Sequence, residues 1–238
     1  MFSSNLGQQF VADLRKFCTG LSMGQDLQIE AKPDKTFVTI IDQQISDFCK
    51  QHASAIGFHF YSEEDHSELN FPAMVVDPLD GTLELIAGRP ECAVSVAWLP
   101  TPDLKTGFAV VFNPFTGFSL TTSDVAPWKA KPNVDAPIGM ISRTEWSKGL
   151  YKDKSAHLIP RGSIAFKLAL LASGTCDYVV SLRPKNIWDI AAGTMLCQQR
   201  GIEMWSGGKK IERLDQALYE YPLIWARPEL IKTLRAQF

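Results

Sequence analysis

Asp77-Pro78-Leu79-Asp80-Gly81-Thr82 is the stretch around which the rest of this 238-residue chain is organised. It directly follows the apolar run Ala73–Val76, which predicts a buried strand. The two carboxylates therefore stand at a strand end, with a backbone carbonyl between them and a Gly-Thr pair after them. Hard cations such as Mg²⁺ prefer oxygen ligands of this kind and usually bind a substrate phosphate as well. The stretch predicts a cation site at the end of a strand.

Two further acidic segments also lie at the edges of apolar segments. Glu63-Glu64 follows the short strand candidate Phe58–Tyr61, and Trp188-Asp189 precedes an apolar segment with helical spacing. Each segment has an ordinary structural explanation, because acidic turns are common and Asp189 would cap a helix that begins at Ile190. Turn and cap formation do not account for the occurrence of all three acidic segments in this order.

The composition is that of a globular protein and excludes several classes. Hydrophobic residues make up 45% of the chain, charged residues 21%, and the net charge is −2. Such a chain has no basic field for nucleic acid and no apolar run of the roughly 20 residues that span a bilayer. We identify no targeting signal. Five widely spaced cysteines predict free, mostly buried thiols, so we expect a cytoplasmic protein: Cys18, Cys49, Cys92, Cys176 and Cys197.

Hydrophobic periodicity predicts a layered α/β architecture. The first half is expected to hold helices at about 10–21 and 42–55, strands at 58–61, 73–76 and 93–99, the last alternating, and a hairpin over 107–122. The second half is expected to alternate strands at 138–141, 177–182 and 223–226 with helices at 164–172, 189–200 and 228–236. Residues 123–135 form a polar loop and a candidate hinge. We therefore divide the chain into 1–122, with most of the metal ligands, and 123–238, which closes the site of one compact unit.

Together the acidic segments resemble a known family. Asp42, Glu63-Glu64, the stretch Asp77–Thr82 and Trp188–Gly193 are similar to the signature of the inositol monophosphatase superfamily of Mg²⁺-dependent, lithium-sensitive phosphatases. The resemblance extends from about Asp13 to the end of the chain. It implies an αβαβα layered sandwich with mixed sheets, a sugar-phosphatase-like fold. It also implies an enzyme that hydrolyses a small phosphorylated metabolite with two or three Mg²⁺ ions, and it allows a homodimer.

The resemblance assigns the metal ligands residue by residue. Glu63, Asp77 and the Leu79 carbonyl would hold one Mg²⁺, and Asp77, Asp80 and Asp189 would hold a second. A bridging aspartate is physically sensible, because the two ions of such sites lie roughly 3.5–4 Å apart. The substrate phosphate would lie between the ions.

The resemblance also assigns catalytic and substrate-binding groups. The attacking water would lie near Glu63 and Thr82, and Asp42 would take the Thr82 proton because a hydroxyl alone is a poor base. The N–H groups of Gly81 and Thr82 would bind phosphate at the start of a helix. Gly162-Ser163 resembles a second substrate-binding turn, although Ser163 is also a good helix cap. The roles of Glu64, Lys32 and Lys35 stay open.

The surroundings of the Trp-Asp motif bear on the substrate. Arg183 and Lys185 would reach a second phosphate, and Ser142-Arg143 resembles the nucleotidase branch. Typical inositol phosphatases carry a Glu seven positions before the Asp of Trp-Asp, where this chain has Leu182. Conversely, Gly88-Arg89-Pro90 resembles a stretch found in other branches, including histidinol-phosphate phosphatases.

We rank the substrates accordingly. A 3′(2′),5′-bisphosphate nucleotide such as adenosine 3′,5′-bisphosphate comes first and inositol 1-phosphate second. Histidinol phosphate or fructose 1,6-bisphosphate follow. A non-catalytic protein that binds a phosphorylated ligand is disfavoured because every catalytic position is occupied. A nucleic-acid-binding module is disfavoured because the chain lacks a basic patch.

Overall fold

The computed structural model describes residues 4–19, 29–31, 37–65, 67–124, 134–152, 154 and 157–238. Lys32 and Lys35, the C-terminal end of the first predicted helix, and most of the predicted hinge lie outside these residues. None of the helices within the described ranges is long and apolar enough to cross a membrane. The five cysteines are buried free thiols, as the sequence predicts.

The first sheet has five strands in the order β3-β4-β5-β6-β7. β3 pairs with β4 in parallel, and the other neighbours pair antiparallel. The predicted strands and the hairpin are confirmed: β3 (His59–Ser62), β4 (Ala73–Asp80), β5 (Ala93–Leu99), β6 (Phe108–Phe112) and β7 (Ser119–Thr121). β4 continues four residues past the predicted end, because an irregularity in its pairing with β5 between Asp77 and Asp80 lets the strand run through the motif.

Helices cover both faces of this sheet. Met74 and Val76 of β4 pack in one core cluster with residues of α1 (Ser4–Cys18) and α2 (Ile40–Ala55). Ala73 and Val75 point to the other face and pack in a second cluster, with α5 (Ile164–Ser173) and α6 (Ile187–Gln199). The prediction that 93–99 alternates between buried and exposed positions is therefore wrong. All seven residues of β5 are buried, because neither face of the sheet meets solvent.

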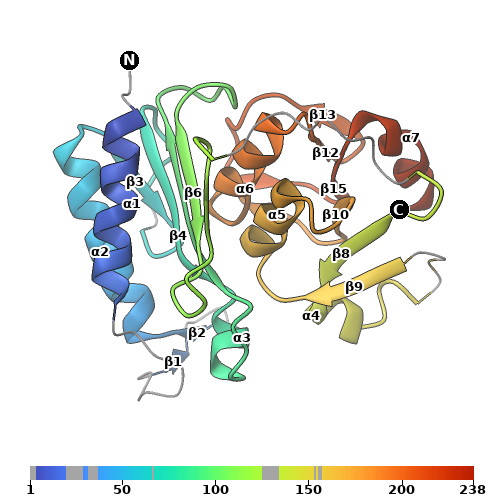
Figure 1. Cartoon of the computed structure of the whole chain (residues 1–238), viewed down its shortest axis with the longest axis horizontal. Coiled ribbons are helices and arrows are strands. Elements are labelled where there is room, and N and C mark those ends of the chain that lie inside the picture. The colour runs from blue at the N-terminus through green and yellow to red at the C-terminus, as the bar shows by residue number, and fades with distance from the viewer. Residues whose placement is uncertain are drawn as a thin grey trace.

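The second sheet lies on the far side of α5 and α6 (Figure 1). Its six strands have the order β13-β12-β15-β10-β8-β9. Their bounds are β8 (Ile138–Ser142), β9 (His157–Arg161), β10 (Tyr178–Ser181), β12 (Glu203–Ser206), β13 (Lys209–Ile211) and β15 (Leu223–Ala226). α7 (Pro228–Gln237) packs on its outer face through Leu230, Ile231 and Leu234. The layers are thus helix, sheet, helix, sheet, helix, and the predicted αβαβα sandwich with mixed sheets is confirmed.

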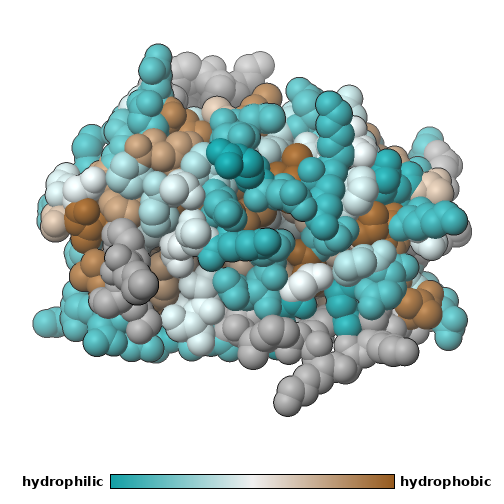
Figure 2. All heavy atoms as spheres, turned by 90° about the horizontal axis from the view of Figure 1, so that it is seen from above, coloured by the Kyte–Doolittle hydropathy of each residue, from teal (hydrophilic) through white to brown (hydrophobic). Residues whose placement is uncertain are grey.

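Short elements complete the chain. Two-stranded ladders join β1 (Glu30–Ala31) to β2 (Phe37–Val38) and β11 (Lys185–Asn186) to β14 (Leu218–Tyr219). α3 (Thr82–Ile86) begins where the sequence predicts a helix, whereas α4 (Arg143–Ser147) and β9 were not predicted. Polar side chains dominate the face shown in Figure 2, and apolar ones form small separate groups there.

Two helices begin two residues earlier than predicted. α2 starts at Ile40 because Thr39 is its N-cap, and the Thr39 N–H donates to Oδ2 of Asp42 over 2.8 Å. α6 starts at Ile187 in the same way, because the Asn186 N–H donates to Oδ2 of Asp189 over 3.0 Å. Asp189 is therefore not the cap residue but the third residue of the helix. Both acids belong to the first turn, where a negative charge stabilises the helix dipole.

Candidate active site

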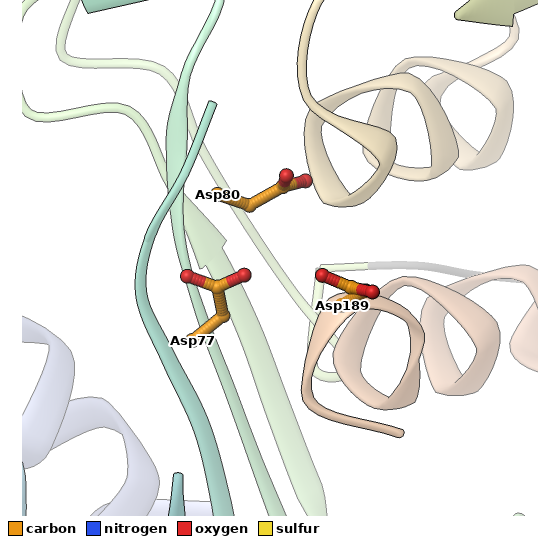
Figure 3. Close-up of side chains that lie close together, drawn as sticks. All are labelled: Asp77, Asp80 and Asp189. Carbon is orange, nitrogen blue, oxygen red and sulfur yellow. The ribbon is translucent and has the colours of Figure 1, made fainter. Parts of the chain in front are cut away.

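Three carboxylates converge at the end of β4. One oxygen each of Asp77, Asp80 and Asp189 lies within 4.8 Å of the others. The irregular end of β4 supplies Asp77 and Asp80, and the first turn of α6 supplies Asp189 from the middle helical layer. Figure 3 shows the three side chains directed toward a common space between β4 and the helices α5 and α6. The sequence predicts Asp77 and Asp80 together from the stretch that holds them, and it adds Asp189 to the same ion only through the family resemblance.

The cluster is electrostatically unfavourable without a cation. Burial raises the pKa of Asp77 well above its ordinary value, and the neighbouring carboxylates of Glu63, Asp80 and Asp189 raise it further. Burial also raises the pKa of Asp189, to about 7, although Lys185 acts in the opposite direction. Only 1% of Asp77 is exposed. Negative charges this close together, one of them fully buried, are stabilised by a positive partner.

A hydroxyl and a carboxylate pair beside the cluster. Thr82 Oγ1 lies 3.2 Å from Asp42 Oδ1 and 3.1 Å from the Leu79 carbonyl, and it can donate its one proton to either. The backbone N–H and the hydroxyl of Thr39 both donate to the other oxygen of Asp42. Burial raises the pKa of Asp42, and the hydrogen bonds from Thr39 and Thr82 oppose that shift. Asp42 is therefore a buried, oriented acceptor behind the Thr82 hydroxyl.

A turn before α5 holds Asp80 in place. Asp80 Oδ2 accepts hydrogen bonds from Ser163 Oγ at 2.7 Å and from the Ala165 N–H at 2.6 Å. Ser163 also caps α5, since its Oγ accepts from the Phe166 N–H at 2.9 Å, and the predicted cap is confirmed. Its φ of 46° is the one positive value of a non-glycine residue in the described part of the chain. Such strained conformations cluster at functional sites.

A cavity of about 360 Å³ opens over these groups. It is lined by every residue that the sequence assigned to the site except Asp42, which lies behind Thr82: Glu63, Asp77, Leu79, Asp80, Gly81, Thr82, Gly162, Ser163, Arg183, Lys185 and Asp189. Glu64 does not line this cavity but a separate depression beside Lys50. The acidic end of the cavity and its basic side chains thus face a single space.

Sequence reasoning missed an ion-pair network at the cavity wall. Glu84 pairs with Arg89 at 2.9 Å and with Arg143 at 3.5 Å. Glu91 pairs with Arg143 at 2.5 Å and with Arg161 at 2.7 Å, and it accepts the Gly162 N–H at 2.8 Å. These partners are as far as 71 positions apart, so no local pattern indicates them.

Two other wall residues were also missed, Lys167 and Glu145. Lys167 is the only charged residue in an apolar helix, and that pattern signals a buried cation with a specific partner. Glu145 accepts from Ser181 Oγ at 2.7 Å and from the Leu182 N–H at 2.9 Å, and so fixes the strand end before Arg183. The Leu182 side chain packs against the core cluster under α7. The position where inositol phosphatases carry a Glu is therefore apolar and engaged in packing.

Comparisons with known proteins agree with this arrangement. The model of the inositol monophosphatase family matches residues 8–130. The chain belongs to the inositol monophosphatase family, a family of phosphatases.

Its relatives act on different substrates, according to their names. The chain is 29% identical over 229 residues to a fructose-1,6-bisphosphatase of Pyrococcus furiosus, covering 89% of this chain and 86% of that one. It is 27% identical over 205 residues to the 3′(2′),5′-bisphosphate nucleotidase CysQ of Buchnera aphidicola, with 76% of each chain covered. A solved inositol monophosphatase/NADP phosphatase in complex with Mg²⁺ and phosphate has the same fold. That comparison gives a TM-score of 0.74 and 15% identity, with 97% of this chain and 92% of that chain covered.

Proposed function

We propose that this protein is a Mg²⁺-dependent phosphomonoesterase whose first substrate class is the 3′(2′),5′-bisphosphate nucleotides. One observation carries the proposal: the Asp77, Asp80 and Asp189 cluster and the Thr82 hydroxyl, with Asp42 behind it, face the same cavity. The first arrangement suits a divalent cation and the second suits the activation of water. Together they supply what metal-assisted hydrolysis of a phosphate ester uses.

The donor set fits Mg²⁺. Glu63, Asp77, Asp80 and Asp189 offer carboxylate oxygens at the cavity wall and Leu79 offers a carbonyl, and Mg²⁺ prefers oxygen ligands of this type. The raised pKa of buried Asp77 supports the same conclusion, because a cation would relieve the repulsion that causes part of the shift. Mg²⁺ bound by these residues would neutralise phosphate charge and make water more acidic. The related structure crystallised with Mg²⁺ and phosphate supports this choice of cation.

The residues of the chain would orient the reactants. Thr82 Oγ1 would accept a proton from the attacking water while its own proton passes to Asp42 Oδ1, with which it already forms a hydrogen bond. Gly81 has a φ of 100°, and a Cβ there would lie 2.9 Å from the Glu91 carbonyl. Only glycine therefore fits this close approach before α3, where the N–H groups of Gly81 and Thr82 would bind the phosphate.

The basic side of the cavity supports a substrate with two anionic groups. Arg183 and Lys185 line the same cavity as the acids, and guanidinium and ammonium groups bind phosphate oxygens well, whereas Arg143 is already paired with Glu84 and Glu91. The apolar Leu182 removes a carboxylate that would accept hydroxyls of inositol. Both named relatives act on bisphosphates, by their names. The fructose bisphosphatase match over most of the chain makes fructose 1,6-bisphosphate the second candidate, ahead of inositol 1-phosphate and histidinol phosphate.

The test is a phosphate-release panel at saturating Mg²⁺. It contains adenosine 3′,5′-bisphosphate, fructose 1,6-bisphosphate, inositol 1-phosphate and histidinol phosphate, with Asp77→Asn as the blank. We expect the highest kcat/KM for adenosine 3′,5′-bisphosphate and no release by the blank. Equal turnover by wild type and blank would sink the proposal, and a preference for inositol 1-phosphate would sink its substrate class.

A double variant, in which both basic side chains are replaced, checks their role. Arg183→Gln with Lys185→Gln should raise KM for adenosine 3′,5′-bisphosphate by roughly tenfold or more, the cost of losing a charged hydrogen bond. KM for a monophosphate that lacks the second anionic group should change little. Equal losses for both substrates would show that these side chains do not select the second phosphate.

A homodimer and a cytoplasmic location stay expectations of the sequence, and light scattering of the purified protein tests the former.

A further inference from the structure

A lysine is fully enclosed next to the proposed cation site. Lys167 lies in the second turn of α5 and is 2% exposed. Lysine is almost never buried to this degree unless its ammonium group is paired. The sites already assigned to Mg²⁺ and phosphate do not explain why this position of an otherwise apolar helix carries a charge.

The ammonium group is fully used by one turn of the backbone. Lys167 Nζ donates to the carbonyls of Arg161 at 3.2 Å, Gly162 at 3.1 Å and Ser163 at 2.9 Å. An ammonium group has three N–H donors, so these three bonds leave none for a substrate. Lys167 therefore hydrogen-bonds the turn and has no N–H left for a ligand in the cavity, although its charge also interacts with Asp80.

The turn needs such an anchor. Ser163 has a φ of 46°, a backbone conformation that serine rarely adopts. Three consecutive carbonyls accept from the buried ammonium group, and that of Ser163 also accepts the backbone N–H of Lys167 at 3.2 Å. On the opposite side, the Gly162 N–H donates to Glu91 at 2.8 Å. The turn is held from both sides.

The same turn sets the position of Asp80. Asp80 Oδ2 accepts one hydrogen bond from Ser163 Oγ of this turn at 2.7 Å and one from the N–H of Ala165, the second residue of α5, at 2.6 Å. Lys167 Nζ thus holds the three carbonyls of the turn, and the residues at the end of the turn hold Asp80. A carboxylate that ligates a cation depends on such outer partners for its orientation.

We propose that Lys167 is a positioning residue for the cation site, which holds the Arg161–Ser163 turn so that Ser163 and Ala165 orient Asp80. The inference rests on the proposed function in that it takes Asp80 to be a cation ligand. It adds that the affinity for Mg²⁺ is determined partly by a side chain that contacts neither the ion nor the substrate.

The experiment measures Mg²⁺ binding itself, by titration calorimetry of Mg²⁺ into metal-free protein without substrate. Lys167→Met keeps the length and volume of the side chain and removes all three donors. We expect the Kd for Mg²⁺ to rise about 10- to 100-fold, the usual effect of losing an outer partner of a ligand. Lys167→Gln, which retains two N–H donors, should give an intermediate Kd. A folded Lys167→Met protein with an unchanged Kd would overturn the proposal.

A matched control separates positioning from general destabilisation. Leu168 is fully buried one residue further along α5, and it packs at Gly193 of α6. Leu168→Ala should lower the melting temperature as much as Lys167→Met does, yet leave the Kd within about twofold, since it keeps every partner of Asp80. An equal rise of the Kd in both variants would contradict a specific role for Lys167. If Lys167→Met does not fold, the Kd values for Mg²⁺ of the wild type, Lys167→Gln and Leu168→Ala are compared instead. A higher Kd in Lys167→Gln alone would support the role of Lys167, and an unchanged Kd in Lys167→Gln would contradict it.

The two proposals fail in different ways. Wild-type protein that binds Mg²⁺ but releases phosphate from no ester would overturn the proposed function and leave the role of Lys167 intact. Wild-type protein that hydrolyses a substrate, together with a Lys167→Met variant of unchanged Kd, would overturn only the positioning role. Wild-type protein that binds no Mg²⁺ would overturn both.

Discussion

Thr82 Oγ1 lies 3.2 Å from Asp42 Oδ1 and donates a hydrogen bond to it, across 40 positions of the sequence. The contact joins the start of α3 to the first turn of α2. Asp42 cannot turn away, because Thr39 holds its other oxygen. The relationship places an oriented, buried acceptor behind a hydroxyl that faces the cavity.

Removing this hydroxyl should reduce turnover and spare metal binding. We expect Thr82→Ala to lower kcat roughly 10²- to 10⁴-fold, the usual contribution of a positioned proton acceptor. Thr82→Ser keeps the hydroxyl and should retain most of the activity. The measurement is kcat at saturating Mg²⁺ alongside the calorimetric Kd for Mg²⁺. Wild-type turnover by Thr82→Ala would exclude the hydroxyl from the reaction.

Neutralising Asp77 should separate metal binding from folding. In Asp77→Asn one of the crowded, buried negative charges is gone, so the metal-free variant should melt at the same temperature as the wild type or higher. Added Mg²⁺ should raise the melting temperature of the wild type, because it binds the native state, and should leave that of the variant unchanged. A variant that Mg²⁺ still stabilises fully would show that Asp77 is not a ligand.

The affinity for Mg²⁺ should depend on pH. The pKa of Asp189 in the metal-free protein is raised to about 7, and a carboxyl group must lose its proton to bind a cation. The Kd should therefore fall as the pH rises through about 7, because Asp189 then loses its proton. Calorimetry between pH 5.5 and 8.5 measures this, and a Kd that does not change with pH would contradict it.

The same shift has a consequence for stability. The native pKa of Asp189 lies above its ordinary value of 3.8, so the native state binds more protons than the unfolded state between about pH 4 and pH 7. The protonated Asp189 therefore stabilises the native state fully below about pH 4, and this contribution is lost as the pH rises through 7. Denaturant unfolding of the metal-free protein should show this contribution, and Asp189→Asn should remove it.

A methyl group at Gly162 should disturb the site through its neighbours. A Cβ there would lie 2.2 Å from Glu84 Cγ and 2.9 Å from the Glu91 carbonyl. Gly162→Ala should cost about 1–3 kcal/mol of unfolding free energy, as overpacking does, and should weaken Mg²⁺ binding because the turn holds Asp80. Gly139→Ala is the control, since its Cβ would meet the Tyr178 ring at 2.3 Å, between strands β8 and β10 of the second sheet. The control should lose stability without a change in Kd; a shift of the Kd in both would argue against a local effect.

The sequence predicts local structure well and long-range pairing poorly. Strand β5 and the position of the acids at the end of β4 follow from neighbouring residues, so both were predictable. The starts of α2 and α6 were misplaced because an Asp at the third helical position resembles a cap. The bonds of Glu91 to Arg161 and Gly162 depend on a fold that brings together residues about 70 positions apart. The lone charge of Lys167 among apolar residues was a readable signal, although its three carbonyl partners were not.

The capping contacts at Asp42 and Asp189 give each acid two duties, one on each side of the carboxylate. Oδ2 accepts the N–H of the residue three positions earlier, and Oδ1 is left for other partners, which for Asp42 is the Thr82 hydroxyl. Alanine at either position would remove both oxygens at once, so a loss of activity could not be told apart from a loss of helix stability. Asparagine retains one carbonyl oxygen for the cap and removes the charge. Damage to the chemistry and fraying of the helix can then be read separately at both positions.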